Sequence, residues 1–173
     1  NIRLIKGDIR DKNSLEKVAK EADIIIHTAA QTAVTTSVFA PEPDFSINAL
    51  GTFNLLEAAR NSGRRPTIIY CSTNKVYGEN VNRIPVIEGR TCYTFSNNIN
   101  LSKDFQSLTF NPQPSTFDPN RGIPESFPID LCEHTPYGCS KLSGDLYMQD
   151  YAHLYGLKVG VFRMSCIYGA RQF

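Results

Sequence analysis

The sequence lacks the features that mark nucleic-acid-binding and membrane proteins. Its formal net charge is +1 and it contains no block of Lys and Arg, so we expect no nucleic-acid partner. No apolar run reaches the length that spans a bilayer, and no secretory signal pattern is present. We therefore expect no membrane partner either.

Cysteine is also scarce, with five residues in a chain of 173. No two of them have Cys-x-x-Cys spacing, so neither a metal site nor a redox pair is expected. The odd number suits a reducing compartment, and we expect the cytoplasm. Hydrophobic residues make up 41% of the chain and charged residues 20%, which is typical of a globular domain.

What the chain does contain is an alternation of short apolar segments and helical patterns. A run of β-branched residues without polar alternation predicts a strand buried on both faces, as in a parallel sheet. The expected strands are 2–5, 22–27, 67–71 and 159–163. The expected helices are 14–20 with Asp11 or Asn13 as cap, 41–62 ended by Gly63, and 136–155 ended by Gly156. This order predicts an α/β fold with a doubly wound parallel sheet.

Residues 79–133 interrupt the alternation. The segment is rich in Asn, Pro, Ser and Thr and has little periodicity. Such a long stretch is unusual inside a compact domain. We expect one domain over 1–173, with 79–133 as an irregular excursion that forms a lid or a subunit contact.

Polar and small residues follow two of the expected strands. His27 to Gln31 follows the first, and Ser72 and Thr73 end the second. The carboxyl ends of parallel strands are where open α/β sheets bind ligands. The alternative is an ordinary tight junction between strand and loop. Asn48, inside an apolar helical pattern, has the same ambiguity, because such a residue is often a satisfied structural group.

Thr135 and Pro136 have the pattern of a helix N-cap and first helical residue. Tyr137 and Lys141 then lie one turn apart on the same face. An ammonium near a phenol lowers the phenol pKa from about 10, so that the tyrosine can take a proton from a sugar hydroxyl. The alternative is a chance pair on an amphipathic helix, and only the other motifs favour the catalytic interpretation.

Taken in order, these motifs resemble the extended short-chain dehydrogenase/reductase family, in the branch that modifies nucleotide sugars. The resemblance covers nearly the whole chain except 79–133. It rests on 7–11, 27–30, 48–58, 72–78, and Tyr137 with Lys141. It implies a Rossmann-like fold, NAD as cofactor and a nucleotide sugar as substrate.

The resemblance also implies roles for individual residues. The cofactor-binding set is Asp8 and Ile9 at the adenine, Ala29, Ala30 and Gln31 along the cofactor, Asn48, Ser72 below the nicotinamide, and Tyr137 and Lys141. Thr73 would bond the reacting sugar oxygen, and Tyr137 would be the acid/base. Lys141 would hold the nicotinamide ribose and tune Tyr137. The catalytic set is therefore Thr73, Tyr137 and Lys141.

Two family features are missing from the sequence. It has no Gly-x-x-Gly-x-x-Gly turn, which would seat the pyrophosphate on a helix N-terminus. The family's C-terminal nucleotide-binding region has no counterpart after Phe173. We expect an incomplete fold that lacks the first βαβ unit and the C-terminal substrate region.

Asn74 and Lys75 follow Thr73, where the family's dehydratases carry Asp-Glu to eliminate water. The sequence is most similar to epimerases of CDP-linked deoxysugars, with Thr35, Thr73, Asn74 and Lys75 as substrate contacts. The resemblance further implies O-antigen biosynthesis and a dimer or tetramer. The alternatives are a 4-epimerase or reductase of the same family, and a non-catalytic dinucleotide-sensing module.

Overall fold

The computed structural model describes residues 2–96, 122–167 and 169–170. The chain divides into two compact units, and the following paragraphs treat each by itself. One comprises 1–76 with 135–173, and the other comprises 77–134. The second unit covers nearly the range of the expected excursion, but its residues 97–121 lie outside the described part of the chain.

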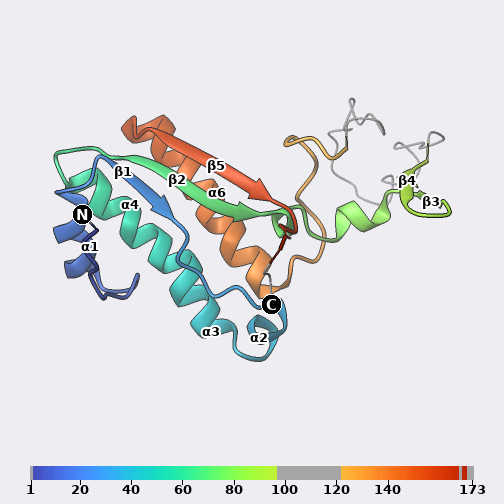
Figure 1. The fold of residues 1–173 in the computed structure, drawn as a ribbon, viewed down its shortest axis with the longest axis horizontal. Helices are drawn as coiled ribbons and strands as arrows, with labels where there is room; N and C mark the ends of the chain where they lie inside the picture. Colours follow the sequence, from blue (N-terminus) through green and yellow to red (C-terminus); the bar gives the residue numbers. More distant parts are fainter. Residues whose placement is uncertain (1, 97–121, 168, 171–173) are drawn as a thin grey trace. The chain divides into compact units, whose positions relative to one another are not determined.

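A three-stranded parallel sheet forms the centre of the first unit. Its strands are β1 (Ile24–His27), β2 (Thr67–Thr73) and β5 (Val159–Met164), in the order β1-β2-β5 (Figure 1). Both pairs are parallel, with Ile24 opposite Thr67 and Ile68 opposite Val159. The expected parallel, Rossmann-like architecture is confirmed.

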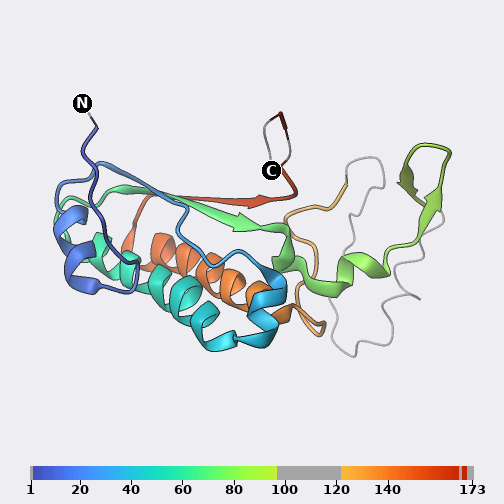
Figure 2. The same cartoon turned by 60° about the horizontal axis from the view of Figure 1, so that its bottom comes forward.

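Three helices cover one face of this sheet, namely α1 (Lys12–Ala19), α4 (Gly51–Asn61) and α6 (Thr135–Tyr155) (Figure 2). Helix α1 begins where predicted, because the Asp11 carboxylate accepts from the backbone N–H groups of Asn13 and Ser14. The covered face holds the core. Its fully buried members are Leu56, Ala59, Ile68, Tyr70 and Met148.

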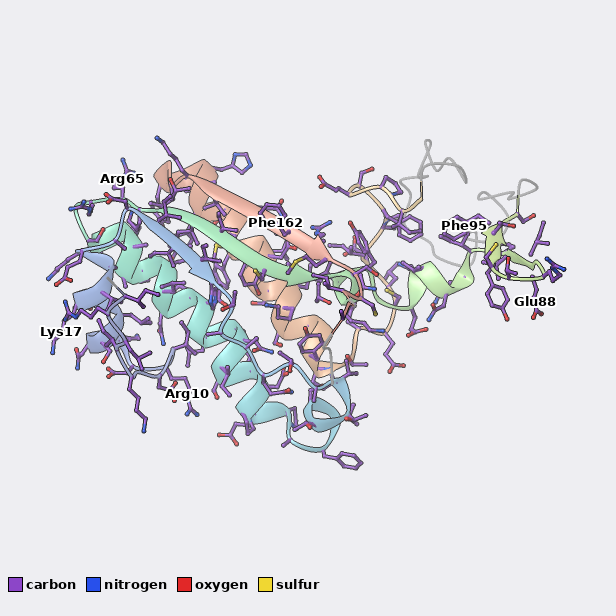
Figure 3. The ribbon with its side chains drawn as sticks, viewed as in Figure 1. Arg10, Lys17, Arg65, Glu88, Phe95 and Phe162 are labelled. Atoms are coloured by element: carbon purple, nitrogen blue, oxygen red, sulfur yellow. The ribbon has the colours of Figure 1, made fainter. Side chains whose placement is uncertain are left out.

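The opposite face of the sheet has no helix among the described residues. Ile24 and Ile26 of β1 are 62% and 64% exposed, and Phe162 of β5 is 55% exposed (Figure 3). The expected burial of β1 on both faces is therefore wrong for the described part of the chain. Burial of an apolar strand face depends on a covering layer, which the strand's own sequence does not supply.

The expected strand at 2–5 is also wrong. The structure has no strand there, and Ile2 and Leu4 are 101% and 94% exposed. A strand needs a hydrogen-bonded neighbour. Among the described residues, β1 pairs only with β2, so nothing in the sheet holds this segment.

The helix expected at 41–62 is present but is not uniform. It consists of α3 (Pro41–Asp44), a π-helical segment η1 (Phe45–Leu50) and α4. Phe45, the first residue of the π-helical segment, is 59% exposed, while Asn48 within it is 1% exposed. A short helix α2 (Val34–Phe39), which the sequence pattern did not predict, precedes it.

The second unit is built from short elements. The 3₁₀ segment η2 (Asn74–Arg83) leads into it, and β3 (Val86–Glu88) pairs antiparallel with β4 (Tyr93–Phe95). Asn80 closes this unit, because its amide donates to the carbonyls of Pro128 at 3.2 Å and Asp130 at 2.9 Å. Within the described ranges, no helix is long and apolar enough to cross a membrane.

Candidate active site

The start of α6 presents the candidate acid/base. Thr135 caps the helix as predicted, because its hydroxyl accepts from the Gly138 N–H at 3.4 Å. Its φ of 61° lies in the left-handed region, which a β-branched residue rarely adopts. Backbone strain of this kind gathers at functional sites. Tyr137 follows two residues later.

Tyr137 is partly buried and held from two sides. Its backbone N–H donates to the Ser37 hydroxyl of α2 at 3.1 Å, and its phenol hydrogen-bonds with Thr73. Burial raises the pKa of Tyr137, and the negative charge of Asp44 raises it further. The hydrogen bond with Thr73 acts in the opposite direction.

Lys141 lies one turn further along α6 and is 3% exposed. Its ammonium donates to the Cys71 carbonyl at 2.7 Å and lies 4.3 Å from the centre of the Tyr70 ring. Burial lowers the pKa of Lys141 to about 8. The expected lowering of the Tyr137 pKa by Lys141 is not what the structure shows, because the ammonium is engaged with β2 and burial dominates at the phenol.

The end of β2 is fixed by a buried ion pair. The Ser72 hydroxyl donates to Asp145 at 3.0 Å, and the Arg163 guanidinium of β5 donates to the same carboxylate at 2.9 Å. Asp145 itself is completely buried on α6. Thr73 is therefore presented at the end of a strand that both α6 and β5 hold. We did not anticipate Asp145 and Arg163, although Asp145 lies one turn beyond Lys141 on the same helix.

The loop after β1 is joined to the π-helical segment by Asn48. The Gln31 N–H donates to the Asn48 side-chain oxygen at 2.8 Å, and the Asn48 amide donates back to the Gln31 carbonyl at 3.0 Å. The same amide reaches the Ser140 hydroxyl of α6 at 3.1 Å. Asn48 is thus a satisfied structural group that fixes the position of the loop carrying Ala29 and Ala30.

His27, at the end of β1, has a defined protonation state. Its Nε2 lies 2.9 Å from the Thr52 hydroxyl oxygen, and that hydroxyl donates its only proton to the Asn48 carbonyl at 2.5 Å. His27 Nε2 must therefore carry a proton. Burial, together with the positive charge of Lys141, lowers the pKa of His27 to about 4, so the ring is neutral at pH 7.

The other predicted residues are more peripheral. Asp8 forms an exposed ion pair with Arg10 at 2.6 Å, which lowers the pKa of Asp8 to about 2 (Figure 3). Ile9 packs closely on Gly51 of α4, because a Cβ added to Gly51 would lie 2.8 Å from the Ile9 side chain. Thr35, Asn74 and Lys75 are exposed.

The structure therefore brings one predicted group together from α6, β2, the π-helical segment η1 and the loop after β1. The group is Gln31, Asn48, Ser72, Thr73, Tyr137 and Lys141. A phenol and a hydroxyl that share a hydrogen bond can hold one substrate oxygen and move its proton. In the described ranges, no cluster of three or more His, Cys, Asp or Glu side chains could hold a metal ion.

The residues of the site fit a dinucleotide. Ala29, directly after β1, is exposed, so the backbone there is open to a flat ligand. Lys141 places a cation beside the end of β2. Both features lie at the carboxyl edge of the parallel sheet, where open α/β sheets bind ligands.

Two family models match the chain. The model described as GDP-mannose 4,6 dehydratase matches residues 1–97. The model described as NAD dependent epimerase/dehydratase family matches residues 114–173.

Curated relatives agree with these models. The chain is 41% identical over its full length to a CDP-paratose 2-epimerase of Salmonella typhi, of which it covers 45%. It is 32% identical to a putative UDP-glucose 4-epimerase of Methanocaldococcus jannaschii, with 97% of this chain and 42% of the relative aligned. The chain thus spans less than half the length of these relatives.

Solved structures give the same result. The UDP-glucose 4-epimerase of Thermus thermophilus in complex with NAD superposes with a TM-score of 0.65 at 29% identity, over 96% of this chain and 42% of that one. The Thermotoga maritima UDP-glucose 4-epimerase with UDP-glucose gives 0.67 at 26% identity, over 100% of this chain and 44% of that one. The chain belongs to the NAD-dependent epimerase/dehydratase family of nucleotide-sugar enzymes, within the extended short-chain dehydrogenases/reductases.

Proposed function

We propose that the full-length protein is an NAD-dependent epimerase of a nucleotide-linked deoxysugar. The observation that carries the proposal is the cluster of Thr73, Tyr137 and Lys141 at the carboxyl edge of the sheet. Its phenol shares a hydrogen bond with Thr73, and its buried ammonium lies one helical turn away.

In this proposal NAD, when bound, supplies reversible hydride transfer at one sugar carbon. Tyr137 takes the proton of the sugar hydroxyl, and Thr73 holds the same oxygen through its own hydroxyl. The keto sugar turns over, and Tyr137 returns the proton after hydride has returned to the opposite face. The raised pKa of Tyr137 suits the proton-donating half of this cycle.

The other predicted residues would hold the cofactor. Ala29, Ala30 and Gln31 would pass along it, and Ser72 would lie below the nicotinamide. The ammonium of Lys141 would bond the nicotinamide ribose. Asp8 and Ile9 would border the adenine, with the exposed Asp8 carboxylate as a hydrogen-bond acceptor. Asn48 would act indirectly, through the Gln31 backbone.

The substrate proposal rests on two further observations. Asn74 and Lys75 cannot act as the acid/base pair of a dehydratase, and both are exposed, as is Thr35. They would contact the substrate. The 41% identity to the CDP-paratose 2-epimerase favours conversion of CDP-paratose to CDP-tyvelose. On the same basis we propose a cytoplasmic homo-oligomer that acts in O-antigen biosynthesis.

A second candidate is a UDP-sugar 4-epimerase or a reductase of the same family, and the similarity to two UDP-glucose 4-epimerases favours the 4-epimerase. A non-catalytic dinucleotide sensor is disfavoured. A sensor would have no use for a phenol, a hydroxyl and a buried ammonium arranged at one strand end.

The test is to incubate the purified full-length protein with NAD and CDP-paratose in deuterated water. We expect CDP-tyvelose by NMR, no net NADH, and no deuterium at the inverted carbon, because the hydrogen leaves and returns as hydride. Turnover of UDP-glucose but not CDP-paratose would instead establish the 4-epimerase. A 4-keto-6-deoxy product from CDP-glucose would contradict the assignment of Asn74 and Lys75.

A further inference from the structure

Asp44 is a buried carboxylate that none of the roles above uses. It ends α3 and is 1% exposed. Its Oδ1 accepts from the Gln31 side-chain amide at 3.0 Å and from the Asn48 amide at 3.1 Å. Its Oδ2 is buried too and has no hydrogen-bond partner among the described residues. Such a group is costly, which makes it a candidate for a functional role.

The hydrogen bonds of Asp44 reach the backbone of the candidate acid/base through two intermediate residues, Asn48 and Ser140. Asn48, which Asp44 orients, also donates to the Ser140 hydroxyl at 3.1 Å. That hydroxyl donates in turn to the Tyr137 carbonyl at 3.0 Å. Asp44 therefore links the loop after β1, the π-helical segment and the first turn of α6.

Asp44 also acts on the site through its charge. Its negative charge raises the pKa of Tyr137 and that of Lys141. Among the other titratable groups, Tyr70 on β2 interacts with the phenol. Lys141 lies one turn further along α6, with its ammonium on the Cys71 carbonyl. No cation lies within ion-pair distance of Asp44 in the described part of the chain, so its charge is not neutralised locally.

We propose that Asp44 is a positioning residue for the reaction proposed above, which orients Gln31 and Asn48 around Tyr137 and favours the protonated phenol through its uncompensated charge. The catalytic meaning of this inference rests on the proposed function. The electrostatic coupling does not, because it can be measured in the resting protein.

The experiment uses the full-length protein with ¹³C-labelled tyrosine ring carbons. Substitution of Tyr137 by Phe identifies the Tyr137 signal by its loss. In the Asp44→Asn variant we expect the titration midpoint of that signal to move to lower pH. The Asn oxygen can still accept both amide hydrogen bonds, so NAD affinity should change by less than about tenfold.

Glu42 offers a matched control on the same short helix. It is exposed, and Glu42→Gln removes the same charge. The Tyr137 midpoint should stay where it is in this variant. An equal shift in both variants would show a general charge effect and would overturn the proposal, as would an unchanged midpoint in Asp44→Asn.

A second readout separates this proposal from the assignment of the reaction. If the protein is the proposed epimerase, the acidic limb of its pH-rate profile should move to lower pH in Asp44→Asn but not in Glu42→Gln. If the protein has no epimerase activity, the NMR titration still decides the coupling. Should Asp44→Asn not fold, Asp44→Ser removes the same charge. Failure of both to fold would assign Asp44 a purely structural role and overturn the proposal.

Discussion

Two of the four tyrosines on helix α6, Tyr137 and Tyr151, lie in contrasting environments. Burial raises the pKa of both. Tyr137 is partly buried and faces Thr73 at a strand end. Tyr151 is 5% exposed, and its hydroxyl donates to the Glu57 carboxylate at 2.8 Å.

The aromatic neighbours of Tyr151 also indicate a structural role for this residue. The Tyr151 ring lies edge-on to the Phe53 and Tyr155 rings, at 6.4 Å and 4.8 Å between centroids. Edge-on aromatic contacts of this kind stabilise packing. The Tyr151 hydroxyl already donates to the Glu57 carboxylate, so it is not available to a substrate. The comparison teaches that the role of a tyrosine on this helix depends on what faces it. The predictions below test that distinction.

The largest expected effect is on turnover. Tyr137→Phe should lower kcat by at least ~10²-fold, because it removes the general acid/base. NAD affinity, measured by calorimetry, should change little. Tyr151→Phe makes the same chemical change at the other end of the helix and should leave turnover nearly unchanged. Equal losses in the two variants would abolish the distinction.

The surroundings of the two ends of α6 should also lose stability at different pH values. His27 of β1 interacts with Lys141 near the first end, and Glu57 of α4 bonds Tyr151 near the second. The unfolded chain protonates His27 near pH 6.5, but folded His27 takes up a proton only near its pKa of about 4. The unfolded state thus binds more protons in that window, so stability should fall by about 2 kcal/mol between pH 7 and pH 4.5. Arg60 lowers the pKa of Glu57 to about 2, so stability from the Tyr151 end should be lost only as the pH falls from about 4.5 to 2.

Urea unfolding at several pH values measures this difference. His27→Gln keeps a donor for Thr52 and removes the titration, so its stability should vary less between pH 7 and pH 4.5. An unchanged pH dependence in this variant would show that another group is responsible.

A smaller effect is expected for Lys141. Lys141→Ala should weaken NAD affinity and lower turnover by about tenfold each, the size expected for losing a hydrogen bond from a charged group. Calorimetry and steady-state kinetics measure the two losses. Lys158→Ala removes an exposed lysine and should change neither quantity. A loss of turnover without a loss of affinity would remove Lys141 from cofactor binding.

The smallest effect is on stability at the Tyr151 end. Tyr151→Phe keeps the ring and removes the hydrogen bond to Glu57, so the free energy of unfolding should fall by about 1 kcal/mol. The loss should be small because Arg60 still pairs with Glu57 at 2.8 Å. Chemical denaturation measures this loss. A loss of several kcal/mol would contradict the prediction, because it would mean that the Tyr151 hydroxyl contributes more than one ordinary hydrogen bond.

Local patterns in the sequence were enough to predict β1, β2, β5, α1 and α6 of the first unit. Asp11 and Thr135 cap helices as predicted because capping depends on neighbouring residues. Gly63 and Gly156 have positive φ after their helices, which only glycine adopts at low cost. The order of strands and helices then led to the parallel sheet.

The sequence-based predictions that were wrong have a common physical cause. Each depended on contacts or geometry beyond the local pattern. The segment at 2–5 has strand-like composition but no hydrogen-bonded neighbour in the described residues. The helix expected at 41–62 contains a π-helical segment, Phe45–Leu50, between α3 and α4. Neither a partner strand nor a π turn is visible in a local pattern.

The candidate site shows the same division. The sequence by itself determined that Tyr137 and Lys141 lie one turn apart, because helix geometry alone requires it. Only the tertiary structure decided that Lys141 donates to the Cys71 carbonyl and that Asp44 lies near enough to act on Tyr137. Those contacts join residues far apart in the chain. The Asp44 contact exists because α3 packs against α6. The Lys141 contact exists because α6 packs against β2 closely enough that a Cβ on Gly144 would lie 2.5 Å from the Tyr70 hydroxyl.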